Sequence, residues 1–352
     1  MLFMESTPSS SMELTTELGS NYTLPEREHW KVVLDNVATV IMTCNTITLM
    51  LGMGSAIWVR DILTHMRRPI GAVIGMVGQF GVLPATGFAF SLMFGLRPYE
   101  ALGVLMVSCS PGGSFSNFFT FWADGDLALS IMMTTCSSVV AFGGMPFNLW
   151  LYSQHWLAED ANSIKIPFIS IVTSLVFITG PVVIGMIVRH YNESVASIIT
   201  KVASLLGWLG FGAVFVIWLI LYWEVFARAT PLIYAASILM PITGFTLAYI
   251  LAKISCQSHK ICRTIGIETG SQNMPVALSV ILLSFRDPVV KAQMIMFPTL
   301  YGLTLLMEVF VGICFYQLYK RKCAKPTDEE YPMAQTAKIE QGTNAEKETL
   351  KA

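Results

Sequence analysis

Long apolar stretches, separated by short polar segments, recur along most of the chain. A helix needs roughly 20 apolar residues to cross about 30 Å of hydrocarbon, and each stretch is near that length or longer. The pattern predicts about nine spans, at residues 33–58, 69–93, 99–121, 127–152, 166–188, 198–222, 230–252, 262–284 and 290–319. The alternation typical of a transmembrane β-barrel is absent from these stretches. We therefore expect an all-α polytopic membrane protein with about nine transmembrane helices.

The composition is typical of a protein embedded in a lipid bilayer. Hydrophobic residues make up 54% of the 352 residues and charged residues only 13%, whereas soluble domains carry roughly 25% charged residues. No nucleotide-binding loop and no nucleophile elbow occurs, so we expect no enzyme, no catalytic residues and no organic cofactor. Cys256, His259 and Cys262 lie close together but lack a further pair of ligands for a zinc site. We expect no nucleic acid partner.

The distribution of basic residues indicates the orientation, because short loops rich in Lys and Arg stay in the cytoplasm. With the N-terminus outside, twelve Lys or Arg residues fall in inner segments and seven in outer ones, not counting the last three in the tail. The sequon at Asn21 is then extracellular and open to glycosylation, whereas the sequon at Asn192 lies inside. We expect a multi-pass protein of the plasma membrane with an extracellular N-terminus and a cytoplasmic C-terminus.

The two termini differ from the apolar region between them. Residues 1–32 are polar and acidic, without the apolar core of a signal peptide, and are expected to be an extracellular segment. Residues 33–322 form the expected transmembrane domain. Residues 323–352 lack the apolar side chains for a core and are expected to be a disordered cytoplasmic tail.

Two spans carry runs of small and polar residues at mid-membrane positions. The third contains CSPGGSFSN (Cys109 to Asn117) and the eighth contains GIETGSQN (Gly266 to Asn273), with Pro275 just beyond. Glycine and proline allow a membrane helix to break, and paired breaks in two halves of a transporter indicate a midplane binding site. We expect spans 2–4 and 7–9 to form a core related by inversion, with spans 1, 5 and 6 as a separate panel.

If the two broken helices cross, their polar side chains come together. The cluster would contain hydroxyl, amide and carboxylate oxygens, namely Ser116, Asn117, Glu268, Gln272 and Asn273. Hard cations prefer such ligands, so Na⁺ is the natural candidate, and a proton on a buried glutamate is the competing one. Short runs such as SN also serve helix packing, but a carboxylate in hydrocarbon is costly enough to favour a functional role for Glu268.

The same motifs resemble those of the bile acid:sodium symporter family. CSPGGSFSN is followed in family order by GDLALSIMMTTCSS, GMP (Gly144 to Pro146) and ETGSQN, and is preceded by QFGVLPATGF (Gln79 to Phe88). The resemblance covers about residues 33–322 and implies a core with two crossing discontinuous helices, a panel domain, and two sodium sites flanking the crossing.

The resemblance implies ligands for each sodium ion. One site takes Ser116, Asn117, Ser130, Thr134 and Glu268. The other takes Gln79, Glu268 and Gln272, with backbone carbonyls such as those of Thr269 and Ser271. Ser130 and Thr134 are four residues apart and hence lie on one helix face. No metal other than sodium is expected.

The resemblance also implies a sodium-coupled symporter that imports amphipathic organic anions, most simply bile acids, by alternating access. Sulfated steroids or another organic anion are alternative cargoes, and a non-transporting receptor or sensor is the rival from another class. Candidate substrate contacts are Asn273 and the first-span residues Thr43, Asn45 and Thr46, for which helix packing is an equal alternative. Asp35 and Glu100, near span ends, are expected to reach interface water, and the role of Glu308 is left open.

Overall fold

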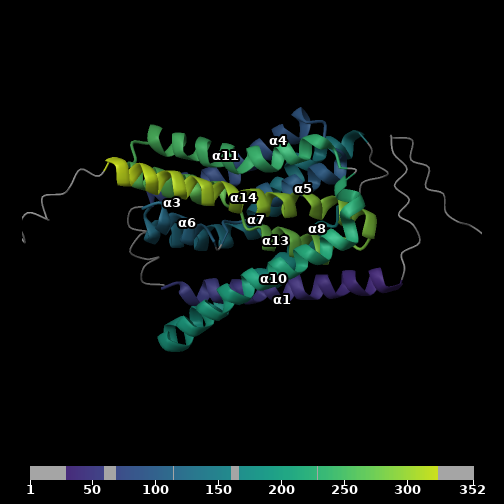
Figure 1. Cartoon of the computed structure of the whole chain (residues 1–352), viewed down its shortest axis with the longest axis horizontal. Coiled ribbons are helices and arrows are strands. Elements are labelled where there is room, and N and C mark those ends of the chain that lie inside the picture. Colours follow the sequence, from purple (N-terminus) through teal and green to yellow (C-terminus); the bar gives the residue numbers. More distant parts are fainter. Residues whose placement is uncertain (1–28, 59–68, 114, 160–165, 228, 324–352) are drawn as a thin grey trace, which may run out of the picture.

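The computed structural model describes residues 29–58, 69–113, 115–159, 166–227 and 229–323. Across these ranges the chain is an elongated bundle of helices (Figure 1). Within the described ranges, seven helical stretches are long and apolar enough to cross a membrane: Trp30–Ala56, Ile70–Met93, Leu127–Leu157, Phe168–Tyr191, Glu193–Glu224, Pro231–Ile254 and Pro288–Lys322. The prediction of an all-α polytopic membrane protein is therefore confirmed.

Several of these stretches are built from more than one helical element. The elements are α1 (His29–Ala56), α3 (Ile70–Val77), the π-helix η1 (Gly78–Val82), α4 (Leu83–Met93), α5 (Pro98–Ser108), α6 (Ser116–Trp122), α7 (Leu127–Glu159), α8 (Phe168–Thr179), α9 (Pro181–Tyr191), α10 (Glu193–Ala227), α11 (Pro231–Ile254), α12 (His259–Gly270), α13 (Met274–Ser284) and α14 (Pro288–Cys323). Most predicted ends agree within a few residues. The helices α7 and α10 run well beyond the predicted spans, to 33 and 35 residues, because amphipathic turns extend them past the purely apolar segment.

Each of the two spans with a mid-membrane polar run is broken by a non-helical segment. Helix α5 ends at Ser108 and α6 begins at Ser116, while α12 ends at Gly270 and α13 begins at Met274. Pro111 and Pro275 have no N–H to donate. The glycines within the two polar runs tolerate a non-helical backbone. The interruptions predicted from these residues are present in the structure.

Prolines inside two other helices leave carbonyl groups that neighbouring helices satisfy. Pro84 cannot donate to the carbonyl of Phe80, and the Asn148 side chain on α7 donates to that oxygen at 3.0 Å. Pro241 leaves the carbonyl of Ser237 free in the same way, and the Thr304 hydroxyl on α14 donates to it at 2.7 Å. These bonds tie η1 to α7 and α11 to α14 within the apolar interior.

Helices α1 and α10 form a layer along one side of the bundle, where α10 crosses α1 (Figure 1). Glycines permit the close approach of α1 to α10 and to α9. A Cβ atom at Gly52 would lie 2.3 Å from the Cβ of Ala203 on α10, and one at Gly54 would lie 2.0 Å from the Val182 carbonyl oxygen on α9. The rest of the bundle is centred on α5, α13 and α14, whose inward side chains form the main apolar core.

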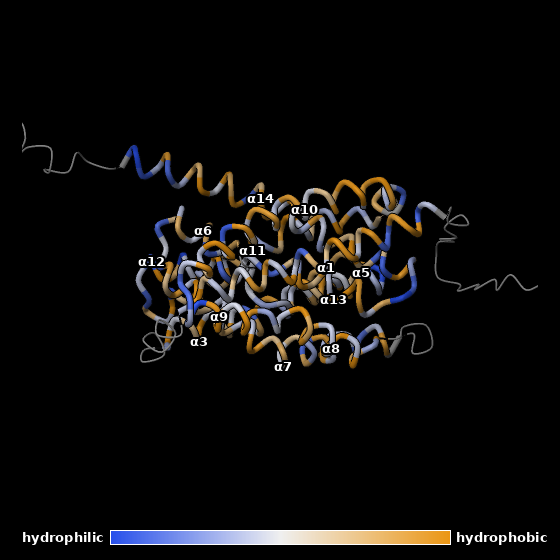
Figure 2. The backbone as a smooth tube through the Cα atoms, turned by 90° about the horizontal axis from the view of Figure 1, so that it is seen from below, coloured by the Kyte–Doolittle hydropathy of each residue, from blue (hydrophilic) through white to orange (hydrophobic). Residues whose placement is uncertain are grey.

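Polar residues gather at the two ends of the bundle, and apolar residues occupy the band between them (Figure 2). At one end, Asp124 pairs with Lys320 at 2.7 Å and accepts a hydrogen bond from Tyr316 at 3.1 Å. At the opposite end, Asp35 pairs with Lys291 at 3.2 Å and accepts a hydrogen bond from Tyr222 at 2.6 Å. Each end therefore has an ion pair that joins α14 to another part of the fold.

The expectation that Asp35 and Glu100 reach interface water is wrong. Their exposed fractions are 5% and 0%. Glu100 forms an ion pair with Arg97 and accepts a hydrogen bond from the Thr230 hydroxyl at 2.7 Å. Buried charges are retained when they are paired, and a sequence position near a helix end does not reveal the partner.

The predictions about the termini fall largely outside the described residues. The sequon at Asn21, most of the expected N-terminal segment and all but the first residue of the expected tail lie in ranges 1–28 and 324–352. Asn192 is described, and its side-chain oxygen accepts a hydrogen bond from the backbone N–H of Val195 at 3.0 Å, at the start of α10.

Candidate ion and substrate site

The two interrupted helices cross at their non-helical segments and pair there through the backbone. The Gly113 N–H donates to the Ser271 carbonyl at 2.8 Å, and the Asn273 N–H donates to the Pro111 carbonyl at 2.8 Å. Gly112 and Gln272 form an isolated antiparallel bridge between these bonds. The backbone groups freed by the two breaks thus satisfy each other in part, which is necessary where water is excluded.

The carboxylate of Glu268 lies beside this crossing and is fully buried. Its Oε1 atom accepts a hydrogen bond from Ser116 on α6 at 2.7 Å and another from Ser130 on α7. Its Oε2 atom accepts one from Thr134 on α7 at 3.0 Å. Asn117 joins the group because its side-chain oxygen lies 2.8 Å from the Ser130 hydroxyl oxygen. The structure therefore brings together all five residues of the first predicted site.

The charge of Glu268 has no cationic side chain beside it among the described residues. Its side-chain partners are three neutral hydroxyl groups, and no ion pair within the described part of the chain involves it. An ionised carboxylate buried without a counter-charge is strongly disfavoured. A bound cation would remove this penalty, and oxygen atoms of hydroxyl, amide and carboxylate groups are the ligands that hard cations take.

The residues of the second predicted site lie on the other side of the crossing. Gln79 lies in the π-helix η1, and its Nε2 atom is 3.4 Å from the backbone oxygen of Glu268. Gln272 donates from Nε2 to the Thr269 carbonyl at 3.0 Å and accepts at Oε1 from Ser110 at 3.3 Å. Single π-helical turns inside α-helices occur frequently at functional sites.

Two buried oxygen atoms of this second group have no hydrogen-bond partner: Gln79 Oε1 and Thr269 Oγ1. Native proteins rarely leave buried polar atoms unsatisfied, so such atoms call for an explanation. Both belong to residues predicted as ligands, although only the backbone carbonyl of Thr269 was expected to contribute. The donor set of this group, like that of the first, fits a sodium ion.

Glycine at position 112 keeps the space between the two groups open. A Cβ atom there would lie 2.7 Å from Gln79 Nε2, 3.1 Å from Glu268 Oε2 and 3.3 Å from Ser137 Oγ. The first of these separations is shorter than real Cβ contacts. Only glycine lets the backbone run this close to the side chains of both groups.

Three residues that the sequence analysis did not select also support the crossing. The Gly112 N–H donates to the Ser137 hydroxyl at 3.0 Å. Tyr301 on α14 donates to the Gly270 carbonyl at 2.5 Å and accepts from the Gln272 N–H at 3.2 Å. The position of Ser137, one turn after Thr134 on α7, was a usable signal, and so was the position of Ser110 within the run CSPGGSFSN. Nothing in the apolar sequence around Tyr301 marks its role.

Three of the four candidate substrate residues are engaged in helix contacts. Thr43 donates to the Thr39 carbonyl at 2.8 Å within α1. Asn45 donates to the Gly207 carbonyl on α10 at 3.3 Å. Thr46 donates to the Met42 carbonyl at 2.9 Å and accepts from Ser279 at 2.8 Å. This geometry favours the packing alternative for Asn45 and Thr46, whereas the bond of Thr43 lies within its own helix and does not decide between the alternatives.

Asn273 differs from them because it lies on a cavity wall. Its side-chain oxygen accepts from the Val276 N–H at 3.2 Å and so caps α13, and its amide nitrogen is 3.4 Å from the Gly112 carbonyl. The cavity, of about 30 Å³, lies between α1 and α10 on one side and the crossing on the other. Gln272 and Ser116 share its wall.

A larger cavity of about 210 Å³ continues along the same interface. Asn117 and Thr134 of the first ion group line it on one side, and Thr200 and Ser204 of α10 on the other. Phe115 belongs to the walls of both cavities, and its ring centroid is 4.4 Å from that of Trp208. The space between the α1 and α10 layer and the rest of the bundle is thus mainly apolar, with the ion groups at one wall.

Comparison with known proteins identifies the group to which this fold and site belong. The model of the Sodium Bile acid symporter family matches residues 44–229. The chain belongs to the sodium bile acid symporter family. Membership in this family of sodium-coupled transporters confirms the prediction that the chain is not an enzyme.

Individual members of the sodium bile acid symporter family are similar over most of the chain. The ileal sodium/bile acid cotransporter of Oryctolagus cuniculus is 35% identical over 322 residues, which are 92% of this chain and 91% of that protein. The protein of the same name from Homo sapiens is 35% identical over 334 residues, or 95% and 93%. The sodium-dependent organic anion transporter of Homo sapiens is 37% identical over 289 residues, or 82% and 76%.

Proposed function

We propose that this chain is a sodium-coupled symporter of the plasma membrane that imports amphipathic organic anions, most simply bile acids. The observation that carries the proposal is the buried carboxylate of Glu268, held by three hydroxyl groups at the crossing of two interrupted helices and without a cationic partner among the described residues. The names of the similar family members, which describe sodium-dependent carriers of bile acids and organic anions, support the same function.

The proposed architecture has nine spans. Seven of them are the long helical stretches. The other two are interrupted and are formed by α5 with α6 and by α12 with α13. An inverted repeat relates spans 2–4 to spans 7–9, since each set contains one interrupted member in its middle. The panel consists of α1, α8 with α9, and α10. The close packing of α1 against α9 and α10 supports this grouping.

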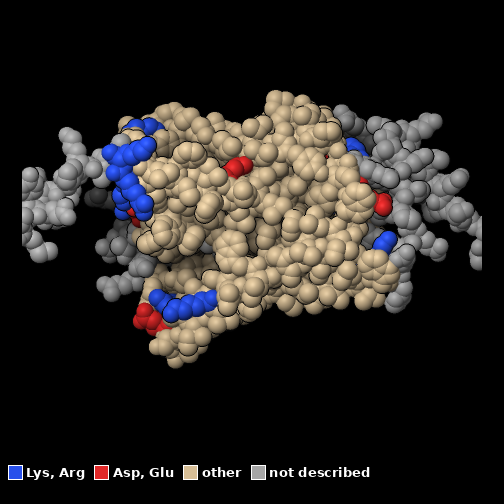
Figure 3. Space-filling view, in the orientation of Figure 1, with Lys and Arg blue, Asp and Glu red and all other residues tan. Residues whose placement is uncertain are grey.

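We propose that the end of the bundle carrying Asp124 and Lys320 faces the cytoplasm. Figure 3 shows Lys and Arg side chains gathered at the end where α14 finishes, and cytoplasmic segments carry such an excess. The opposite end, with Asp35 and Lys291, then faces the cell exterior. The N-terminus is extracellular and the C-terminus cytoplasmic in this orientation.

Two sodium ions occupy the two groups in this proposal. The first is bound by the side chains of Ser116, Asn117, Ser130, Thr134 and Glu268. The second is bound near Gln79, Thr269, Ser271 and Gln272, where two buried oxygen atoms lack hydrogen-bond partners. The single charge of Glu268, placed between them, offsets one of the two positive charges, and an anionic substrate at the Asn273 wall offsets the other.

Alternating access couples the ions to the substrate. Binding of ions and substrate drives transport only if their affinities differ between the two conformations. In this structure the larger cavity lies at the half of α1 that ends at Ala56, toward the proposed cytoplasmic side. On the outer side, Asp35 of α1 and Tyr222 of α10 are joined to Lys291 of α14. These features support an inward-facing conformation with its outer side closed.

The proposal is tested by uptake of a labelled taurine-conjugated bile acid and a labelled steroid sulfate into cells expressing the chain, in sodium and in choline medium. We expect sodium-dependent uptake of at least one compound, lost in Glu268→Gln at matched surface expression. Uptake that continues in choline would indicate proton coupling. No uptake of either compound, with the protein at the surface, would contradict transport of these two classes and favour a receptor or sensor.

A further inference from the structure

A further cavity lies between α11, α12 and α14, and we call it the α11–α14 cavity. It shares Phe119, Ser271 and Leu305 with the wall of the small cavity beside Asn273. Its volume is about 280 Å³. Its walls include Ile242 and Phe245 of α11, Ile267 of α12, and Leu305 and Ile313 of α14. Ile242 and Phe245 are 47% and 37% exposed on the side of the bundle, so the cavity is reached from the surrounding lipid. Its occupant is therefore a molecule with an apolar body.

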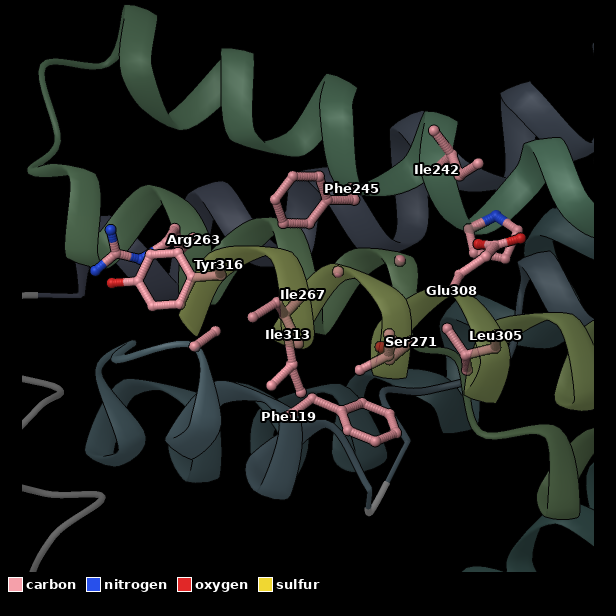
Figure 4. A pocket seen from close by; sticks show the side chains of 15 residues that line it. Phe119, Ile242, Phe245, Arg263, Ile267, Ser271, Leu305, Glu308, Ile313 and Tyr316 are labelled. Carbon is pink, nitrogen blue, oxygen red and sulfur yellow. The ribbon is translucent and has the colours of Figure 1, made fainter. Parts of the chain in front are cut away.

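One carboxyl group interrupts this apolar lining. Glu308 of α14 lies on the cavity wall, and its Oε1 atom is buried without a hydrogen-bond partner. Figure 4 shows Glu308 at one end of the cavity beside Leu305, with Arg263 and Tyr316 at the other end. Glu308 and Tyr316 are eight residues apart on α14, which places them about 12 Å apart along the helix axis.

Arg263 is the basic residue of the wall, and it is engaged elsewhere. Its guanidinium group donates to the Asp124 carbonyl at 3.0 Å and stacks over the ring of Tyr316, with 5.2 Å to the ring centroid. Its Nε atom is buried without a hydrogen-bond partner. No ion pair with Glu308 is formed within the described residues. Among the described residues neither charged group of the wall has an ion-pair partner, but Arg263 is held by a carbonyl and an aromatic ring, whereas Glu308 Oε1 has no hydrogen-bond partner.

We propose that the α11–α14 cavity binds an amphipathic amine, whose ammonium group pairs with Glu308 and whose apolar body lies along Ile267 and Ile313. A charged donor on a buried carboxylate oxygen is a strong interaction, and the low-polarity walls strengthen it further. The charge of this ligand is opposite to that of the proposed cargo, so the cavity discriminates against the transported anions.

The cavity also reaches the interrupted segment of α12. Gly270 and Ser271 form part of its wall, and the carbonyl of Ser271 accepts the backbone hydrogen bond that joins the two crossing segments. An occupant therefore contacts the backbone of the ion site from the lipid side without entering the space between the panel and the core.

The experiment measures equilibrium binding of tritiated 1-adamantylamine to the purified full chain in lipid nanodiscs, in potassium buffer without sodium. These conditions require neither transport nor sodium binding, so the result is independent of the proposed function. The competitors 1-adamantanol and 1-adamantanecarboxylate have the same apolar cage with a neutral and an anionic head group. Glu308→Gln removes the charge at constant size, and Ile313→Trp fills the cavity while keeping the carboxylate.

We expect saturable amine binding that weakens about tenfold or more in Glu308→Gln, as for removal of one partner of a buried charge pair. Ile313→Trp abolishes the binding, and neither competitor displaces the amine at equal concentration. Equal binding to wild type and Glu308→Gln would overturn the proposal, as would equal competition by all three compounds. Preferential binding of the carboxylate, lost in Arg263→Gln, would assign the cavity to an anion instead.

Discussion

Thr134 on α7 and Glu268 on α12 are 134 residues apart in the chain, and the Thr134 hydroxyl donates a 3.0 Å hydrogen bond to the Glu268 carboxylate. Ser130, one turn earlier on the same face of α7, donates to the other carboxylate oxygen. The proposed first ion is thus held between α7 and α12, which meet through side chains, with α6 supplying Ser116 and Asn117. Its affinity depends on their relative position, which is the property that a conformationally coupled ion site requires.

The first prediction concerns these hydroxyl groups. Thr134→Val removes one oxygen at nearly constant volume, so we expect the sodium concentration for half-maximal uptake to rise about tenfold, equivalent to ~1.4 kcal/mol. Ser138→Ala is the matched control, because the Ser138 hydroxyl is also buried on α7 but donates to the Thr134 carbonyl at 2.8 Å. An unchanged sodium dependence in Thr134→Val would remove this residue from the site.

The second prediction concerns the space at Gly112. Gly112→Ala places a methyl group 2.7 Å from Gln79 Nε2 and 3.1 Å from Glu268 Oε2, which displaces both side chains from the proposed ion positions. We expect loss of sodium-dependent uptake with the protein still at the cell surface. Gly143→Ala on α7 is the control, since a Cβ atom there has no neighbour within 4 Å. Full sodium-dependent uptake by Gly112→Ala would contradict the proposed geometry.

The third prediction concerns the outer ion pair. Lys291→Met breaks the link from α14 to Asp35 and Tyr222, which favours opening on the outer side. External sodium then meets the outward-facing state more often, so its half-saturating concentration falls. The double variant Asp35→Asn with Lys291→Met removes both charges of the pair and should behave alike.

Arg286→Met is the control for this third prediction, because it removes an exposed positive charge near the same end of α14. We expect its sodium dependence to match that of wild type. A half-saturating concentration that rises in Lys291→Met, or that falls equally in Arg286→Met, would show that the ion pair does not hold the outer side closed.

The fourth prediction concerns pH and the opposite end of the bundle. The hydrogen bond from Lys320 lowers the pKa of Asp124 below its usual value of 3.8. A carboxyl whose pKa is lowered on folding stabilises the protein above its unfolded pKa and loses that contribution as the pH falls through the folded value. The stability difference between wild type and Asp124→Asn should be constant at neutral pH and shrink below about pH 4. Thermal unfolding of the purified chain measures it, and a difference that grows on acidification would contradict the assignment.

The general fold and much of the candidate site could be predicted from the sequence. Apolar length predicts spans well, and the Pro and Gly residues around Pro111 and Pro275 predict breaks, because both effects are local. Ser130 and Thr134 could be paired from their spacing on one helix face. The contact of these residues with Glu268 depends on the crossing of the two interrupted helices. That crossing was expected from the family motifs.

The remaining features depend on contacts between distant segments. The partners of Asp35 and Glu100 lie on other elements or at a neighbouring turn, so their burial could not be read from the positions of these residues in the chain. The Tyr301 hydroxyl on α14 donates a hydrogen bond to the carbonyl at the end of α12. The residues around Tyr301 in the sequence are apolar and give no sign of this contact. The helix contacts of Asn45 and Thr46 likewise depend on how closely α1 approaches α10 and α13.

The central claim, that Glu268 is the anionic ligand of bound sodium, is tested most directly by thermal unfolding of the purified chain in sodium, potassium and choline chloride at equal ionic strength. Sodium at ten times its Kd should stabilise wild type by about 1.4 kcal/mol relative to choline. Glu268→Gln should lose this increment, and Glu224→Gln, which removes an exposed carboxylate of α10, should keep it. A sodium increment retained in full by Glu268→Gln, or one that potassium reproduces in wild type, would contradict the account.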